Sequence, residues 1–243
     1  MKVSRKIKIG IAAILSVIII LAVGVYIYSS DYYRADSDAL SAIQSTETVT
    51  VSQIDGAYVF APDKAECGLI FYPGGKVEHT AYAPLLSALA KEGILCILVE
   101  MPLNLAVLDT DAADDFFGEF PDIKSWYIGG HSLGGSMAAS YASDNTDKLD
   151  GLILLASYST ADLSSTDLDV ISVFGSNDGV LNMDKYNEYR SNLPYSTTEK
   201  IIIGGCHAYF GNYGVQESDG IPTVTKEEQL SETVEIIIET IRK

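Results

Sequence analysis

The sequence predicts an α/β fold with one doubly wound, mostly parallel sheet, preceded by a single membrane-spanning helix. Three observations predict this. Short apolar runs alternate with amphipathic helical patterns, and a pattern typical of a β-hairpin comes before the first of these runs. A basic N-terminus precedes a long uncharged run. Strands that alternate with helices favour parallel β–α–β units, whose helices cover both faces of the sheet. The chain has 243 residues, enough to bury one such core.

The expected elements follow the hydrophobic periodicity of the chain. An antiparallel hairpin is expected from residues 48–51 and 57–61, with its turn at Asp55-Gly56. Further strands are expected at residues 68–72, 94–99, 125–129, 152–156, 170–174 and 200–203. Helices are expected at about residues 81–92, 105–117, 134–143, 184–191 and 226–242.

Residues 1–30 are expected to be a cytoplasmic basic flank and a transmembrane signal anchor. Four cations precede the uncharged run 9–27, whose 19 residues span about 28 Å as a helix, close to the thickness of a bilayer core. A cleaved signal peptide is the alternative, but its apolar region is usually about 7–15 residues long and ends at a small-residue cleavage site. The positive-inside rule places the remainder of the chain outside the cytoplasm.

The remainder of the chain is strongly acidic. The net charge is −17, and setting aside the four cations before Ile9 leaves 12 basic against 33 acidic residues, a net charge of −21. This charge excludes nucleic acids and anionic membrane surfaces as electrostatic partners. One acidic set has no regular metal-loop spacing and is expected to be a solvated face, namely Asp109, Asp111, Asp114, Asp115, Glu119 and Asp122.

A strand–turn–helix pattern surrounds Ser132. An apolar run at 126–128 leads into Gly130-His131-Ser132-Leu133-Gly134, and an Ala-rich helical pattern follows. This arrangement raises one hydroxyl above the edge of a parallel sheet, where a base can reach it. Ser132 is therefore the predicted nucleophile, in a strained backbone conformation and with glycines on both sides because strand and helix cross closely.

A serine hydroxyl needs a histidine base, and the chain has three histidines. His131 lies within the turn, so its side chain is expected to point away and to pack or form a hydrogen bond there. His79 precedes the serine and is expected at the surface. His207 lies in a glycine-rich loop after the apolar run 201–203, the place where this kind of sheet presents a base. His207 is therefore the predicted base.

The acid that orients this histidine is expected between Ser132 and His207, in a loop after a strand. Asp178 lies in such a loop, 175–179, and would accept the Nδ1 hydrogen of His207. A simple turn residue before Gly179 is the alternative role for Asp178. Four other acids are less suitable: Asp162, Asp167 and Asp169 precede the strand at the wrong edge of the sheet, and Asp184 is expected to cap or open the next helix.

An oxyanion hole requires two N–H donors. Leu133, the residue after the nucleophile, is expected to supply one. Gly75 in the Pro73-Gly74-Gly75 loop is expected to supply the other, with the Lys76 N–H as an alternative. Residues 157–169 are too few for a helical cap, so an open mouth is expected. Tyr209, Phe210 and Tyr213 either line an acyl pocket or merely pack.

Several strings resemble the α/β-hydrolase superfamily, and in particular the bacterial α/β hydrolase fold-5 family, akin to dienelactone hydrolases and esterases. These strings are FYPGGKVEHTAYAPLLSALAKEG, VEMPLNLAVL, IGGHSLGGSMAASYA, FGSNDGV and GGCHAYFGNYGVQ. The resemblance covers roughly residues 45–240 and implies the same Ser132, Asp178 and His207. Dienelactone hydrolases carry a cysteine nucleophile, whereas this turn carries a serine, which argues against a thiol mechanism.

The expected organisation is an anchor (1–30), a stalk or short helix (31–46) and an α/β-hydrolase catalytic domain (47–243). The expected function is hydrolysis of a small-molecule carboxylic ester or related acyl substrate through an acyl-enzyme, with no cofactor and no metal. Two alternatives remain open: a non-catalytic binding or scaffold protein on the same fold, and a cell-envelope acyltransferase. Cys67, Cys96 and Cys206 are expected to be structural.

Overall fold

The computed structural model describes residues 4–242. One sheet of eight strands, in the order β1-β2-β4-β3-β5-β6-β7-β8, forms its centre. The strands are β1 (Val49–Ile54), β2 (Ala57–Pro62), β3 (Cys67–Tyr72), β4 (Ile94–Val99), β5 (Trp126–His131), β6 (Gly151–Leu155), β7 (Asp169–Gly175) and β8 (Thr198–Ile202). Strands β3 to β8 are parallel, and β1 and β2 add an antiparallel edge. The predicted doubly wound fold is confirmed.

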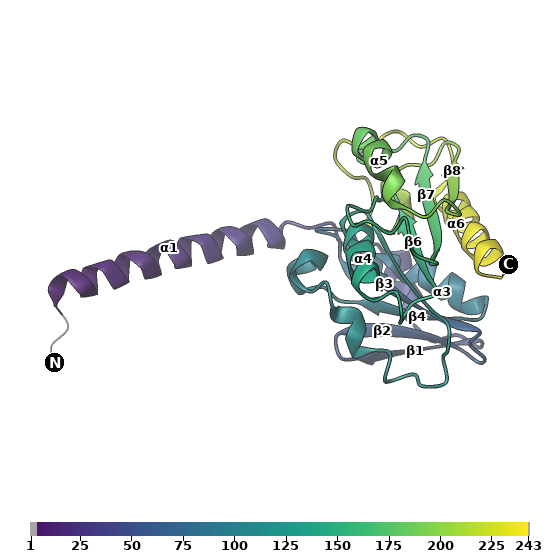
Figure 1. Cartoon of the computed structure of the whole chain (residues 1–243), viewed down its shortest axis with the longest axis horizontal. Coiled ribbons are helices and arrows are strands. Elements are labelled where there is room, and N and C mark those ends of the chain that lie inside the picture. The colour runs from purple at the N-terminus through teal and green to yellow at the C-terminus, as the bar shows by residue number, and fades with distance from the viewer. Residues whose placement is uncertain (1–3, 243) are drawn as a thin grey trace.

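The helices are α1 (Arg5–Ser30), α2 (Ser37–Ala42), α3 (Ala83–Lys91), α4 (Leu133–Asp144), α5 (Met183–Tyr189) and α6 (Lys226–Ile241). Helices α3 and α6 cover one face of the sheet and α4 covers the other (Figure 1). Alternate residues of β3 serve the two faces: Leu69 and Phe71 face α3 and α6, whereas Ile70 and Tyr72 face α4. Side chains along a strand point alternately to the two faces of the sheet, so a sheet covered on both sides needs apolar residues at every position of the strand.

The hairpin forms as predicted, with β1 paired to β2 from Val49 opposite Pro62 to Ile54 opposite Ala57. Its turn residues, Asp55 (φ 41°) and Gly56 (φ 76°), both have positive φ. Two consecutive residues with positive φ form a type I′ turn, whose backbone twist matches the twist of the two strands that a two-residue hairpin loop joins.

The helix predicted at residues 105–117 is wrong. The segment contains two 3₁₀ turns instead, at Ala106–Leu108 and Ala112–Asp115, and a third, at Pro102–Asn104, precedes it. The Tyr72 hydroxyl donates to the carbonyl of Thr110 and accepts the N–H of Ala113, so a side chain from the sheet takes up backbone groups that a helix would pair. Aspartate is also a poor residue in a helix interior, and this segment is rich in it.

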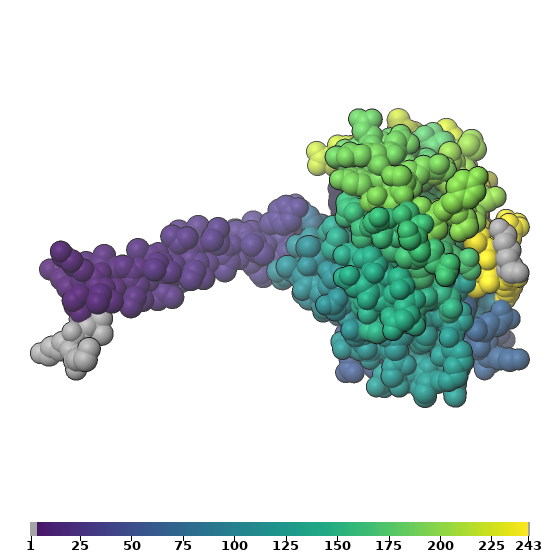
Figure 2. Space-filling model, in the orientation of Figure 1, coloured from purple at the N-terminus to yellow at the C-terminus, as the bar shows by residue number. Residues whose placement is uncertain are grey.

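Helix α1 projects away from the body of the molecule (Figure 1), and the same projection stands clear of the body in the space-filling view (Figure 2). It is long and apolar enough to span a membrane, and its spanning window is unburied. Residues 31–46 lie against the body. The Tyr33 N–H donates to the Lys76 carbonyl at 2.8 Å, the Asp36 N–H donates to the Asn212 carbonyl at 2.8 Å, and Lys226 pairs with Asp36 at 2.8 Å.

Candidate active site

Ser132 stands at a sharp turn between β5 and α4, with φ 53° and ψ −122°. Few residues other than glycine adopt this conformation, and it persists only where the surroundings enforce it. A Cβ on Gly130 would lie 2.5 Å from the Gly134 carbonyl carbon, and one on Gly134 would overlap the carbonyl oxygens of Tyr72 and Pro73. The two glycines flank Ser132 because strand and helix leave no room for side chains.

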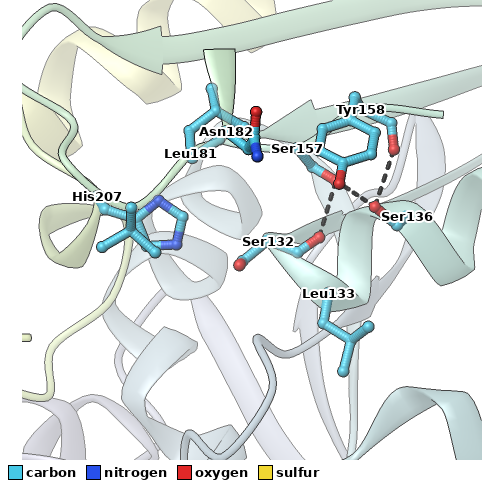
Figure 3. A pocket seen from close by; sticks show the side chains of 10 residues that line it. Ser132, Leu133, Ser136, Ser157, Tyr158, Leu181, Asn182 and His207 are labelled. Atoms are coloured by element: carbon cyan, nitrogen blue, oxygen red, sulfur yellow. Dashed lines mark hydrogen bonds between the residues drawn. The ribbon is translucent and has the colours of Figure 1, made fainter. Parts of the chain in front are cut away.

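Two serines that the sequence analysis did not single out hold this turn in place. The Ser157 hydroxyl donates to the Ser132 carbonyl at 2.7 Å and lies 3.1 Å from the Ser136 hydroxyl. The Ser136 hydroxyl donates in turn to the Tyr158 carbonyl at 2.8 Å (Figure 3). Serines are common in this chain, so only their positions in the fold reveal this role.

His207 and Asp178 meet as predicted. His207 Nδ1 lies 2.8 Å from Asp178 Oδ2, and each side chain is only 1% exposed. The other carboxylate oxygen of Asp178 accepts the N–H groups of Val180 and Leu181 at 2.8 and 2.7 Å. Asp178 is thus fixed by its own loop while it holds the ring of His207.

This contact leaves the second nitrogen of His207, Nε2, free to act as an acceptor. Among residues 4–242, Nε2 has no hydrogen-bond partner. Ser132 and His207 line the same cavity, of about 190 Å³, and the Ser132 hydroxyl lies on the side that faces the His207 ring (Figure 3). Hydrogen bonds between catalytic groups are often long without substrate and shorten when substrate binds.

The backbone beside Ser132 offers two N–H donors. Neither the Gly75 nor the Leu133 N–H has a hydrogen-bond partner within residues 4–242. The two residues are adjacent, since a Cβ on Gly75 would lie 2.9 Å from Leu133 Cδ2. The alternative donor, Lys76, is already engaged, because its N–H donates to the Asn104 carbonyl at 2.8 Å. The geometry therefore favours Gly75 over Lys76.

His131 lies beneath His207, with 4.4 Å between ring centroids. The Gly74 N–H donates to the Tyr82 hydroxyl at 3.0 Å, and this hydroxyl lies 2.8 Å from His131 Nδ1. Burial, with a smaller contribution from His207, holds the pKa of His131 well below its usual value. His131 is therefore neutral and accepts the Tyr82 proton at Nδ1, so its hydrogen bond goes to a residue before α3 and not to the expected group within the turn.

Asp219 is a functional candidate that the sequence analysis missed. Its carboxylate accepts the N–H groups of Gly179 (3.1 Å), His207 (3.1 Å), Ala208 (2.8 Å) and Gly220 (2.8 Å). Burial acts to raise the pKa of Asp219, but these N–H donors outweigh it and the pKa is lowered. Asp219 thus ties the loop of Asp178 to the loop of His207. No sequence pattern distinguishes it from an ordinary turn aspartate before glycine.

The possibility that Tyr209, Phe210 and Tyr213 line an acyl pocket is not supported. The residues that line the cavity are Ser132, Leu133, Ser136, Ala156, Ser157, Tyr158, Val180, Leu181, Asn182 and His207. Phe210 and Tyr213 are buried and pack near His131, with ring centroids 5.7 and 6.5 Å from it. They pack against His131 because the loop after His207 folds back into the core.

Several further residues whose side chains could carry chemistry have structural roles in the fold instead. His79 is half-buried and stacks on Tyr58, with 5.8 Å between ring centroids. Asn182 caps α5, and Asp184 lies in its first turn. Cys206 is buried, which raises its thiol pKa to about 12. Within residues 4–242, no three His, Cys, Asp or Glu side chains are arranged to hold a metal ion.

Comparison with known proteins agrees with this architecture. Residues 68–231 match the model of the Alpha/beta hydrolase family. No curated protein sequence matches the chain. Among solved structures, dienelactone hydrolase from Anabaena variabilis is similar at 13% identity, with a TM-score of 0.60 and coverage of 81% of this chain and 98% of that one.

Two further structures are similar. Est1E from Butyrivibrio proteoclasticus is 14% identical, with a TM-score of 0.54 and coverage of 81% of this chain and 100% of that one. A CIB-like hydrolase from Thermoplasma acidophilum is 16% identical, with a TM-score of 0.52 and coverage of 79% and 98%. At these identities the likeness establishes the fold alone. The family match covers most of the chain, including the turn at Ser132 and the loops of Asp178 and His207, and the protein belongs to the Alpha/beta hydrolase family.

Proposed function

We propose that this protein is a membrane-anchored, extracytoplasmic serine hydrolase that cleaves a carboxylic ester through Ser132, His207 and Asp178. The observation that carries the proposal is the 2.8 Å contact between Asp178 and His207, whose ring lines the same cavity as Ser132. A buried carboxylate on Nδ1 fixes the tautomer in which Nε2 accepts a proton. The names of the similar esterase and dienelactone hydrolase structures agree with ester chemistry.

The reaction proceeds in two halves. His207 Nε2 removes the hydroxyl proton as Ser132 Oγ attacks the ester carbonyl, and the N–H groups of Gly75 and Leu133 stabilise the oxyanion. The protonated His207 then gives its proton to the departing alkoxide, leaving an acyl-serine. In the second half a water molecule, deprotonated by His207, attacks the acyl-serine; the bond between the acyl carbon and Ser132 Oγ breaks, His207 returns the proton to Oγ, and the carboxylic acid is released. Asp178 stabilises the imidazolium in both halves.

Labelling with a fluorophosphonate tests the nucleophile directly. The wild-type chain is expected to react at Ser132, and Ser132→Ala is expected to lose the label. Ser140→Ala is the matched control, since Ser140 lies on the same helix, α4, but does not line the cavity, and it should still label. Equal labelling of wild type and Ser132→Ala would remove the proposed nucleophile.

Anchoring is proposed for α1, which has a mean hydropathy of 2.8 over its most apolar 18 residues and carries Arg5, Lys6 and Lys8 in its first turn. An uncleaved anchor stays in the mature protein, whereas a signal peptide is removed. Mass spectrometry of the membrane-fraction protein should therefore recover residues 9–27. A mature chain that starts near residue 30 would contradict the anchor and leave the hydrolase proposal intact.

A further inference from the structure

The chain leaves α1 directly beside the candidate oxyanion loop, residues 73–76. Tyr33 follows the end of α1 by three residues, and its backbone pairs with that loop: its N–H donates to the Lys76 carbonyl, and its carbonyl accepts the Glu78 N–H, both at 2.8 Å. Three extended residues reach at most about 10 Å. Tyr33 must therefore lie within about 10 Å of the end of the apolar helix, whichever way the helix points, and the Lys76 carbonyl is one hydrogen bond of 2.8 Å beyond the Tyr33 nitrogen.

Side-chain contacts strengthen this attachment. The Lys76 ammonium lies 4.4 Å from the centre of the Tyr28 ring and 3.2 Å from the Asp31 carboxylate. Tyr28 belongs to the last turns of α1, where an aromatic ring suits the boundary between lipid and water. The loop beside Ser132 is thus joined to the membrane end of α1 by both backbone and side chains.

Exposed aliphatic side chains lie in the segment next to this junction. Leu103, Val107 and Leu108 are 43%, 54% and 53% exposed, and we call them the apolar patch. The turn that contains Leu103 contacts α1, and it lies beside the end of α1 where the helix meets the body (Figure 1). Exposed apolar side chains close together commonly mark a contact surface.

The backbone of this segment is also strained. Leu103 and Asn104 have φ values of 54° and 56°, in the left-handed region that leucine rarely adopts. The Asn104 carbonyl accepts the Lys76 N–H, so the segment that carries the patch is bonded directly to the oxyanion loop. The two residues form a tight turn, which the Leu105 N–H closes by donating to the Pro102 carbonyl at 3.0 Å, and this turn leaves the Leu103 side chain at the surface.

We propose that the apolar patch inserts into the outer leaflet and sets the active-site mouth on the membrane, so that the enzyme takes an acyl ester resident in the bilayer. The inference rests on the proposed function, that of a membrane-anchored serine hydrolase. A bilayer is the favoured occupant because the anchor holds the patch within reach of lipid, whereas nothing tethers a protein partner there. The exposed acids Asp109 and Asp111 follow the patch and limit insertion to its aliphatic side chains.

The chemistry is that of the proposed site, with the substrate class now specified. The bond between the acyl carbon and the alcohol oxygen of the membrane ester breaks, and a bond from the acyl carbon to Ser132 Oγ forms. The proton of Ser132 passes through His207 Nε2 to the alcohol, and water then releases the fatty acid. Substrate and fatty acid both partition into lipid, so a site at the surface needs no long transfer through water.

Kinetics of the full-length protein in nanodiscs of zwitterionic phosphatidylcholine test the proposal, since the acidic charge of the chain disfavours an anionic bilayer. The variant Val107→Glu/Leu108→Glu should lower hydrolysis of a diacylglycerol ester embedded in the nanodisc by about tenfold or more, corresponding to about 1.4 kcal/mol. It should change hydrolysis of water-soluble p-nitrophenyl acetate less than about twofold, since neither residue lines the cavity. Tyr195→Glu is the matched control: Tyr195 is fully exposed but precedes β8, at the opposite edge of the sheet.

The outcomes separate the two proposals. Loss of activity on the bilayer ester alone, in Val107→Glu/Leu108→Glu alone, supports membrane insertion of the patch. Unchanged activity on both substrates, or an equal loss in Tyr195→Glu, overturns it and leaves the hydrolase standing. Undiminished p-nitrophenyl acetate hydrolysis by Ser132→Ala would instead overturn the proposed function.

A depth measurement provides independent evidence without introducing charge. Val107→Cys labelled with an environment-sensitive fluorophore should be quenched by spin-labelled lipids, whereas labelled Tyr195→Cys should not. The three native cysteines are buried, so labelling is selective. Absence of quenching at residue 107 overturns the proposal. A signal at that position that depends on protein concentration would instead indicate a second copy of the chain on the patch, and would also overturn it.

Discussion

The imidazole rings of His131 and His207 lie 4.4 Å apart, yet only His207 has a carboxylate partner. His131 receives the Tyr82 hydroxyl instead, at 2.8 Å, and is buried on every side. The environment therefore assigns different roles to two adjacent histidines: one can accept a proton in the cavity, and the other stays neutral below it.

The buried His131 should make stability depend on pH. Burial lowers its pKa in the folded chain, whereas the unfolded chain has a pKa near 6.5. Below that pH the unfolded state binds more protons, so the free energy of unfolding falls as pH falls, by up to about 1.4 kcal/mol per pH unit from this residue. Chemical denaturation of wild type and His131→Gln between pH 7.5 and about 5 measures this.

The difference between the two proteins isolates His131, because burial also lowers the pKa of His79 and contributes to the wild-type slope. His131→Gln should show a shallower decline toward low pH. If the free energy of unfolding fell equally with pH in the two proteins, His131 would be charged, or accessible to protons, in the folded state.

Asp178→Asn should abolish most turnover while preserving the fold. The asparagine oxygen can still accept the Val180 and Leu181 N–H groups, but an amide nitrogen facing Nδ1 forces His207 into the wrong tautomer. We expect kcat to fall by about 10⁴ on p-nitrophenyl acetate, with little change in melting temperature. Asp184→Asn, an exposed acid of α5, is the control and should retain full activity; activity within about tenfold of wild type for Asp178→Asn would argue for the turn-residue role.

Gly75→Ala should damage the oxyanion hole. The added methyl would lie 2.9 Å from Leu133 Cδ2 and 3.3 Å from Leu133 Cβ, so Leu133, whose N–H is the other proposed donor, must shift to admit it. Loss of one such donor typically lowers kcat by about 10²–10³, and we expect a fall of this order with KM little changed. Gly118→Ala is the control, since nothing lies within 4 Å of its new methyl. An effect on KM alone would show that Gly75 contacts substrate in the ground state only.

Asp219 should act as a positioning residue. Asp219→Ala removes the common acceptor of the Gly179 and His207 N–H groups, so the acid and base loops can separate. We expect kcat to fall by about 10–10², as for residues that orient catalytic groups, with partial rescue by Asp219→Asn. The pH profile of kcat/KM distinguishes a positioning role from a purely structural one. If Asp178 no longer holds the His207 ring firmly, the acidic limb of this profile should shift. A profile identical to wild type would reduce Asp219 to a structural role.

The sequence was sufficient where the signal is local. Each buried strand is a short apolar run between turns, and the turn at Ser132 combines a strand, two glycines and a helix within a few residues. Chain order then limited the base to His207 and the acid to a loop after a strand. The elements around residues 105–117 could not be found this way, because the Tyr72 hydroxyl that captures their backbone comes from a distant strand.

By itself, then, the sequence determined the strand and helix alternation and the apolar N-terminal run, and it singled out the residues proposed as nucleophile, base and acid. These depend on side-chain periodicity and on glycine positions, which are written along the chain. Only the tertiary structure decided that Asp219 joins two loops, that the Lys76 N–H is already engaged, and that Tyr33 joins the C-terminal end of α1 to the loop at residues 73–76. These are contacts between residues far apart in sequence, made by backbone groups whose partners are fixed only when the sheet and its loops assemble.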